Sequence, residues 1–245
     1  MCNRDETAND YQVTSRRDVL RFGAAAAITV LGGVTWAANP PKPGAAPPPN
    51  AIAPADAMKR LLEGNARYVA NAPNERDFSA GRAARAQAQY PFAAILSCAD
   101  SRVAPELAFD EGPGELFVVR VAGNFINPDL LASLEYGVQF LGVPFIFVLG
   151  HSKCGAVDAA IKVLKTNAVL PGHLPDLVTA IKPSVIIAEK TKTGDLLDNA
   201  IAENVRRQVA ILKAAKPVIS KFYAQKKIEI AGGVYDLETG RIAVL

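Results

Sequence analysis

Two short apolar runs of this chain each end in a polar turn that carries reactive side chains. The first run, FAAILS, leads into Cys98 and Asp100, and the second, FIFVLG, leads into His151 and Cys154. Runs rich in branched and aromatic residues are typical of buried parallel strands, whose carboxyl ends meet at one edge of a sheet. The sequence therefore predicts that these four side chains lie close together, although the two turns are far apart along the chain.

The side chains in the two turns allow two interpretations. Two thiolates and an imidazole are ligands that Zn²⁺ accepts, and a set of three leaves a fourth position open, as in catalytic zinc sites. Alternatively, Cys98 and Cys154 could form a disulfide, and His151 could be only a polar turn residue. A disulfide would explain none of His151, Asp100 and Arg102.

The same residues resemble the two signatures of the β-class carbonic anhydrases, C-x-D-S-R and H-x-x-C-G, which read CADSR and HSKCG here. The resemblance implies that Cys98, His151 and Cys154 hold Zn²⁺ as cofactor. It also implies a catalytic dyad, in which Arg102 holds the Asp100 carboxylate away from the metal. Asp100 is a possible fourth zinc ligand in a closed state favoured at low pH.

The resemblance further implies a lyase reaction in which hydroxide on zinc attacks CO2 and gives bicarbonate and a proton. Gly123 and Asn124, in the turn after another apolar run, are either substrate-binding residues or an ordinary turn pair, and Gly155, at a helix start, is the third candidate substrate-binding residue. Gly112 stands before a Pro-Gly pair where many plant-type members have Gln, so a side-chain amide contact to the substrate is not expected there. His173 matches no motif and is interpreted as a loop residue.

Alternating apolar runs and helical patterns predict an α/β fold, a single domain with a mostly parallel sheet flanked by helices. The predicted strands are 92–97, 116–121, 145–149 and 228–231. The predicted helices are 56–71 with Asp56 as N-cap, 78–89, 128–141 with Asn127 as cap, 155–165, 174–190 and 198–215. The resemblance covers about residues 56–240 and includes the segment LLEGNARYV.

The beginning of the chain is interpreted as a signal peptide, residues 1–38, followed by a proline-rich linker, residues 39–55, and the enzyme domain, residues 56–245. Arg16 and Arg17 form a twin-arginine pattern, followed by an apolar run and by small residues at Ala37 and Ala38. The apolar run is shorter than the ~20 residues of a membrane span. We therefore expect a periplasmic or otherwise exported bacterial protein with no span after signal cleavage.

Composition excludes some classes of partner. Half of the 245 residues are apolar, which suits one sizeable core, and no basic block with interleaved aromatic residues indicates nucleic acid.

The family resemblance implies a homodimer or a higher homo-oligomer. Two alternative functions are open at this stage: hydrolysis of carbonyl sulfide or carbon disulfide, and a non-catalytic periplasmic zinc-binding or disulfide protein.

Overall fold

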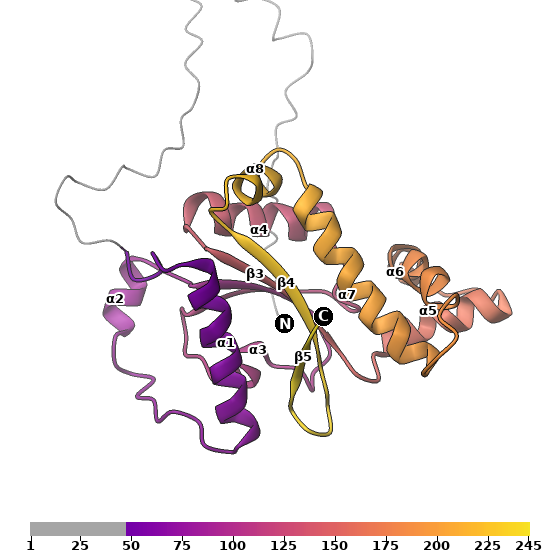
Figure 1. Cartoon of the computed structure of the whole chain (residues 1–245), viewed down its shortest axis with the longest axis horizontal. Helices are drawn as coiled ribbons and strands as arrows, with labels where there is room; N and C mark the ends of the chain where they lie inside the picture. The colour runs from indigo at the N-terminus through magenta and orange to yellow at the C-terminus, as the bar shows by residue number, and fades with distance from the viewer. Residues whose placement is uncertain (1–47) are drawn as a thin grey trace, which may run out of the picture. The chain divides into compact units, whose positions relative to one another are not determined.

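A five-stranded sheet runs through the part of the chain that the computed structural model describes, residues 48–245 (Figure 1). The sheet order is β2-β1-β3-β4-β5, with four parallel strands and a last strand antiparallel to β4. The strand bounds are Ala93–Ser97 (β1), Leu116–Arg120 (β2), Phe145–His151 (β3), Glu229–Tyr235 (β4) and Ile242–Val244 (β5). The parallel strands confirm the four predicted runs, whereas the sequence pattern does not predict β5.

Eight helices surround the sheet in the described residues. Their bounds are Pro54–Val69 (α1), Arg82–Gln87 (α2), Pro105–Ala108 (α3), Pro128–Phe140 (α4), Gly155–Thr166 (α5), Leu174–Ala188 (α6), Leu196–Ala214 (α7) and Ile219–Ala224 (α8). The sequence pattern does not predict the short helices α3 and α8, because helices of one or two turns carry too few apolar residues to show a period.

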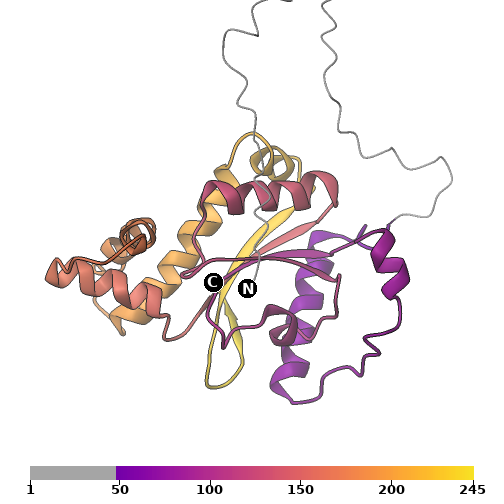
Figure 2. The same cartoon turned by 180° about the vertical axis from the view of Figure 1, so that it is seen from behind.

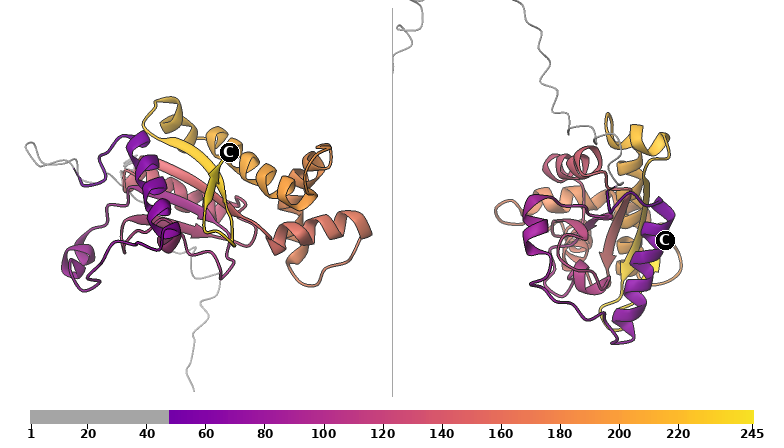
Figure 3. Two further views of the ribbon diagram at one scale, coloured as in Figure 1. Left: turned by 60° about the horizontal axis from the view of Figure 1, so that its bottom comes forward. Right: turned by 90° about the vertical axis from the view of Figure 1, so that its left-hand side faces the viewer.

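Helices cover both faces of the sheet, as the side views in Figure 3 show. On one face, Leu61 of α1 and Phe109, just after α3, belong to the core that includes Phe147 of β3. On the other face, Leu134 of α4 and Leu212 of α7 pack with the remaining strand side chains. The predicted fold class, a mostly parallel sheet flanked by helices, is confirmed.

A third core joins α5, α6 and the first half of α7, and it includes Cys98 and Cys154. Seen from the front and from behind, α5 and α6 lie at the opposite end of the sheet from α1 and α2 (Figures 1 and 2). The two cysteines are thus enclosed by helices that follow β3 in the chain, which excludes water from one side of the turns.

Local hydrogen bonds explain where the helix boundaries differ from the prediction. Asp56 is not the N-cap of α1; the cap is Ala53, and Asp56 lies in the first turn. The helix predicted at 78–89 begins only at Arg82, because the Asp77 carboxylate accepts hydrogen bonds from the Ser79 and Ala80 backbone N–H groups and holds this segment in a turn. The cap predicted for α4 is confirmed, since the Asn127 side chain accepts a hydrogen bond from Leu130 N at 2.9 Å.

The predicted signal peptide and residues 39–47 of the predicted linker lie outside the described residues. Within the remaining linker stretch, Asn50 is buried, and its Nδ2 donates hydrogen bonds to the carbonyl oxygens of Pro91 and Leu141 at 3.1 and 2.7 Å. The chain therefore packs on the domain already at Asn50. Among the helices of residues 48–245, none has the length and hydrophobicity to cross a membrane.

Candidate metal centre

The two reactive turns lie side by side because β1 and β3 are neighbours in the sheet. Cys98 directly follows β1, His151 is the last residue of β3, and Cys154 is the N-cap of α5. The strand register aligns Ser97, the last residue of β1, with Leu149, which is close to the end of β3. Both strands therefore end at the same edge of the sheet. The fold thus brings the two turns together as the sequence predicts.

Three potential ligand atoms converge at this edge. The Sγ atoms of Cys98 and Cys154 and a ring nitrogen of His151 all lie within 4.8 Å of one another, and all three residues are buried. Both thiols are free, so the disulfide that the cysteine count allowed does not form. Two sulfur atoms and one imidazole nitrogen at this separation fit the donor set of a zinc site with three protein ligands.

The hydrogen bond of His151 fixes which ring nitrogen is available. Nδ1 lies 2.9 Å from the Ser152 carbonyl oxygen, which can only accept, so Nδ1 carries the proton and Nε2 carries the lone pair. Nε2 is buried and has no hydrogen-bond partner. A buried acceptor without a partner is costly, and coordination of a metal removes that cost.

The two thiols differ in their affinity for a proton. A hydrogen bond with Cys154 holds the pKa of Cys98 well below its usual range against the opposing effect of burial, and the Gly123 N–H, which lies 3.2 Å from Cys98 Sγ, lowers it further. The same contact with Cys98, together with burial, raises the pKa of the Cys154 thiol. The contact between the two sulfur atoms therefore favours a single proton on the pair, and zinc would displace that proton.

Asp100 and Arg102 form an ion pair at the rim of this cluster. Arg102 Nε and Nη2 donate to the two carboxylate oxygens of Asp100 at 2.9 and 2.7 Å, and the Arg102 backbone N–H donates to Oδ1 at 2.9 Å. These bonds lower the pKa of Asp100 far below its usual range, so the group stays ionised and can only accept hydrogen bonds. Asp100 Oδ2 lies 3.8 Å from His151 Nε2, which puts the carboxylate beside the ligand atoms.

Arg120, at the carboxyl end of β2, binds the turn that carries Cys98. Its Nε donates to the Cys98 carbonyl oxygen at 2.9 Å, and its Nη2 donates to those of Asp100 and Val103, each at 2.7 Å. Arg120 is not among the site residues that the sequence predicts. A charged side chain that ends the apolar run LFVVR is the same signal that identified the other two turns.

The candidate substrate-binding residues lie in the turn that contacts Cys98 and at the start of the helix that follows Cys154. Gly123 adopts a positive φ of 81° and donates its N–H to Cys98, and Asn124 is buried with an unpartnered Nδ2 donor. Gly155 is the first residue of α5, and a Cβ on it would meet nothing within 4 Å. His173 is exposed at the start of α6, away from the cluster in the chain, and its side chain makes no cap hydrogen bond.

Comparison with known proteins gives one consistent family. Residues 93–242 match the sequence model of the family described as carbonic anhydrase. The chain is 42% identical to carbonic anhydrase 2 of Mycobacterium tuberculosis over 189 residues, which is 77% of this chain and 91% of that protein.

Solved structures agree. The Coccomyxa β-carbonic anhydrase in complex with acetazolamide matches 77% of this chain and 86% of its own, with 28% identity and a TM-score of 0.60. One of two tetrameric β-carbonic anhydrases from Sordaria macrospora matches 67% of this chain and 86% of its own, with 25% identity and a TM-score of 0.60.

Proposed function

This chain belongs to the β-class carbonic anhydrases, and from that premise we propose which of its residues hold the metal and which serve the reaction. The protein is a zinc-dependent lyase that interconverts CO2 with bicarbonate and a proton. The alternatives of a sulfur-substrate hydrolase and of a non-catalytic zinc or disulfide protein have no support, because the relatives are carbonic anhydrases and both thiols are free.

Cys98 Sγ, Cys154 Sγ and His151 Nε2 are the proposed zinc ligands. The observation that carries this proposal is the convergence of these three buried atoms within 4.8 Å, with free thiols and a ring nitrogen that no other group satisfies. When bound, zinc supplies Lewis acidity that makes water a usable nucleophile near neutral pH.

Asp100 and Arg102 are the proposed catalytic dyad. The Asp100 carboxylate is ionised and held from one side by Arg102, which leaves its remaining lone pairs to accept a hydrogen bond from the attacking water and orient it toward CO2. The Arg102 guanidinium keeps this carboxylate 3.8 Å from His151 Nε2 instead of in contact with it.

Three residues are proposed to bind the substrate and the product anion. Asn124 offers a buried Nδ2 donor with no partner, and the start of α5 at Gly155 offers backbone donors and the positive end of a helix dipole. Gly123 lies between these elements and Cys98, where a side chain would collide with Ile181.

The direct test combines metal analysis with a CO2 hydration assay on the purified chain. We expect one zinc per chain and rapid acidification of weakly buffered CO2 solution. Removal of zinc with a chelator should abolish the activity, and added zinc should restore it. A chain that hydrates CO2 equally fast without metal would contradict the ligand assignment.

Export and assembly are further proposals. Arg16 and Arg17 support export of the folded protein by a twin-arginine route to the periplasm, with cleavage of residues 1–38. Changing both to Lys should leave active enzyme inside the cell. A homo-oligomer is supported by the description of a related structure as tetrameric, and sedimentation analysis tests it.

A further inference from the structure

A buried group of polar side chains joins α6 and α7 to the turn that contacts Cys98. Ser184 of α6 and Asn204 and Gln208 of α7 are each at most 1% exposed. Asn204 and Gln208 are four residues apart on a helix and therefore lie on the same face. Buried amides in an otherwise apolar core are costly unless each donor and acceptor finds a partner.

The hydrogen bonds of this group have one consistent direction. The Ile126 backbone N–H can only donate, at 3.0 Å, so the Gln208 atom that faces it is the acceptor Oε1. Gln208 Nε2 then donates to Asn204 Oδ1 at 3.3 Å, as does Ser184 Oγ at 3.3 Å. Asn204 Nδ2 is left to donate to the Gly123 carbonyl oxygen at 2.8 Å. Each amide is thus oriented by the previous one, and the last bond of the series holds Gly123.

Gly123 is held from both sides by this arrangement. Its carbonyl oxygen accepts from Asn204, and its N–H donates to Cys98 Sγ at 3.2 Å. Its φ of 81° and the 2.4 Å that would separate an added Cβ from Ile181 Cδ1 leave the turn little freedom. The N–H that points at the Cys98 sulfur therefore depends on the position of the amides on α7.

The helix that carries the amides also packs tightly on the strand that carries His151. An added Cβ on Gly150 would lie 2.6 Å from Val205, and one on Gly232 would lie 2.5 Å from the same side chain. Val205 is the residue after Asn204. One helix thus contacts the strand that ends in His151 through Val205 and holds the Gly123 carbonyl oxygen through the adjacent Asn204.

We propose that Asn204 and Gln208 are positioning residues of the carbonic anhydrase reaction, which hold the Gly123 N–H against Cys98 Sγ and thereby reduce the electron donation of this thiolate to zinc. The inference rests on the proposed role of Cys98 as a zinc ligand. Two thiolates place more negative charge on zinc than neutral ligands do, which weakens its Lewis acidity. A hydrogen bond to one sulfur withdraws part of this charge, and such bonds tune metal sites in general.

The test uses the full chain with cobalt(II) in place of zinc, because thiolate-to-cobalt charge-transfer absorption reports the electron donation of the sulfur directly. Loss of a hydrogen bond to sulfur raises the energy of its lone pair, so Asn204→Ala should move this band to longer wavelength. The zinc form of the variant should lose about 10-fold in kcat/KM for CO2, the lower end of the range for disturbing a hydrogen-bond partner of a metal ligand, because Asn204 acts on Cys98 only through Gly123. Gln208→Met should shift the band in the same direction by less, because Asn204 still contacts Gly123.

Leu212→Ala is the matched control, since Leu212 is fully buried on the same helix but outside the polar group. It should lower the melting temperature and leave the band unchanged, which separates positioning from general destabilisation. If Asn204→Ala does not fold, the shift in Gln208→Met decides the question. Wild-type band positions in the folded variants would overturn the positioning role, whereas a wild-type cobalt protein without the band would overturn the ligand assignment itself.

Discussion

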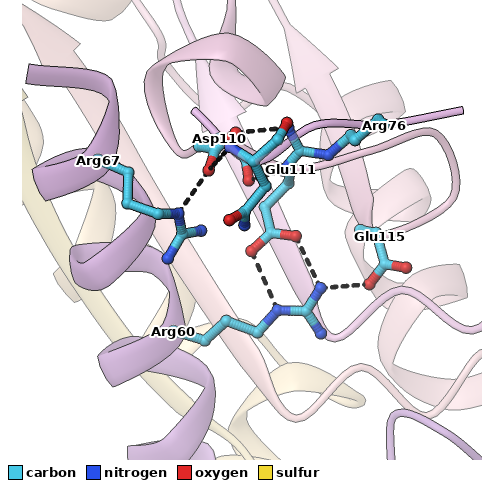
Figure 4. A network of polar contacts seen from close by, with 7 residues as sticks. Arg60, Arg67, Arg76, Asp110, Glu111 and Glu115 are labelled. Carbon is cyan, nitrogen blue, oxygen red and sulfur yellow. Dashed lines mark hydrogen bonds and ion pairs between the residues drawn. The ribbon is translucent and has the colours of Figure 1, made fainter. Parts of the chain in front are cut away.

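Two clusters of charged and polar side chains lie at opposite ends of the parallel strands, and they differ in whether their polar atoms have partners. At the carboxyl ends, the metal centre combines two free thiols with a His151 Nε2 atom that has no partner. At the amino ends lies a second cluster, the arginine brace, drawn in Figure 4 and made of Arg60, Arg67, Arg76, Asp110, Glu111 and Glu115.

Every carboxylate of the arginine brace is satisfied by arginine. Glu111 accepts from Arg60 Nε and Nη2 at 3.0 and 2.7 Å, and Asp110 accepts from both Arg67 and Arg76 (Figure 4). The brace ties α1 to the segment between α3 and β2. The difference between the clusters teaches that buried charge alone does not mark a reactive site, because the metal centre, and not the brace, holds a buried ligand atom without a partner, His151 Nε2.

The largest expected effect comes from removing a proposed zinc ligand. Cys98→Ala deletes one of the three donor atoms, so we expect loss of bound zinc and a fall of CO2 hydration to the rate of buffer alone. Glu111→Gln in the brace is the control and should keep one zinc per chain. Metal analysis and stopped-flow assays on both variants measure this, and a Cys98→Ala protein with full zinc and wild-type rate would contradict the comparison.

The second effect belongs to the brace and is one of stability. The Asp110 side chain is 1% exposed, so Asp110→Asn leaves Arg67 and Arg76 without their buried counter-charge. We expect a loss of about 3 kcal/mol in the free energy of unfolding, the lower end of the range for a broken buried pair because both arginines keep contact with water. Urea unfolding measures the loss. The folded fraction should retain zinc and wild-type kcat; a variant that loses zinc while folded would show that the brace supports the site.

A third effect separates chemistry from metal binding. Arg102 is exposed, so Arg102→Ala should leave the unfolding free energy nearly unchanged and keep zinc. The Asp100 carboxylate then loses the group that holds it, and kcat should fall about 10-fold to 100-fold. Arg102→Lys, which restores the charge but not the two parallel bonds, should recover part of the rate. Full activity in Arg102→Ala would remove the dyad from the mechanism.

The smallest effect is a dependence of brace stability on pH. Burial would raise the pKa of Asp110, but hydrogen bonds from Arg76 and Arg67 outweigh it, so the pKa is lowered in the folded state. The stabilisation is therefore fully present above the unfolded pKa of about 3.9 and is lost as the pH falls through the lower folded value. The difference in unfolding free energy between wild type and Asp110→Asn should shrink below about pH 4, by about 1.4 kcal/mol per unit of lowered pKa. A difference in unfolding free energy that grows on acidification would contradict the lowered pKa of Asp110 in the folded state.

The metal centre was more predictable from the sequence than the arginine brace. Cys98 and His151 follow apolar runs directly, so local pattern and the parallel topology are enough to bring them together. The helix cap at Asn127 is equally local. The contacts of Arg60 and Asp110 join segments that no pattern relates, because an arginine on a helix face looks the same whether or not a carboxylate lies opposite.

Local sequence pattern also does not reveal which polar side chains near the site are buried by tertiary packing. Asn204 and Gln208 look like ordinary polar positions of an amphipathic helix, and only the packing of α7 on the sheet reveals that both are buried. The strand β5 has three residues, and its register depends on the Asp236 turn, in which Asp236 accepts hydrogen bonds from the Glu238 and Thr239 backbone N–H groups. Tertiary context therefore decides these features.

Zinc K-edge X-ray absorption of the purified wild-type chain tests the central claim most directly, because it identifies the atoms that bind the metal. The account predicts one zinc per chain with two sulfur scatterers at about 2.3 Å and imidazole nitrogen at about 2.0–2.1 Å, and loss of one sulfur in any zinc that Cys98→Ala retains. Zinc surrounded only by nitrogen and oxygen would contradict it.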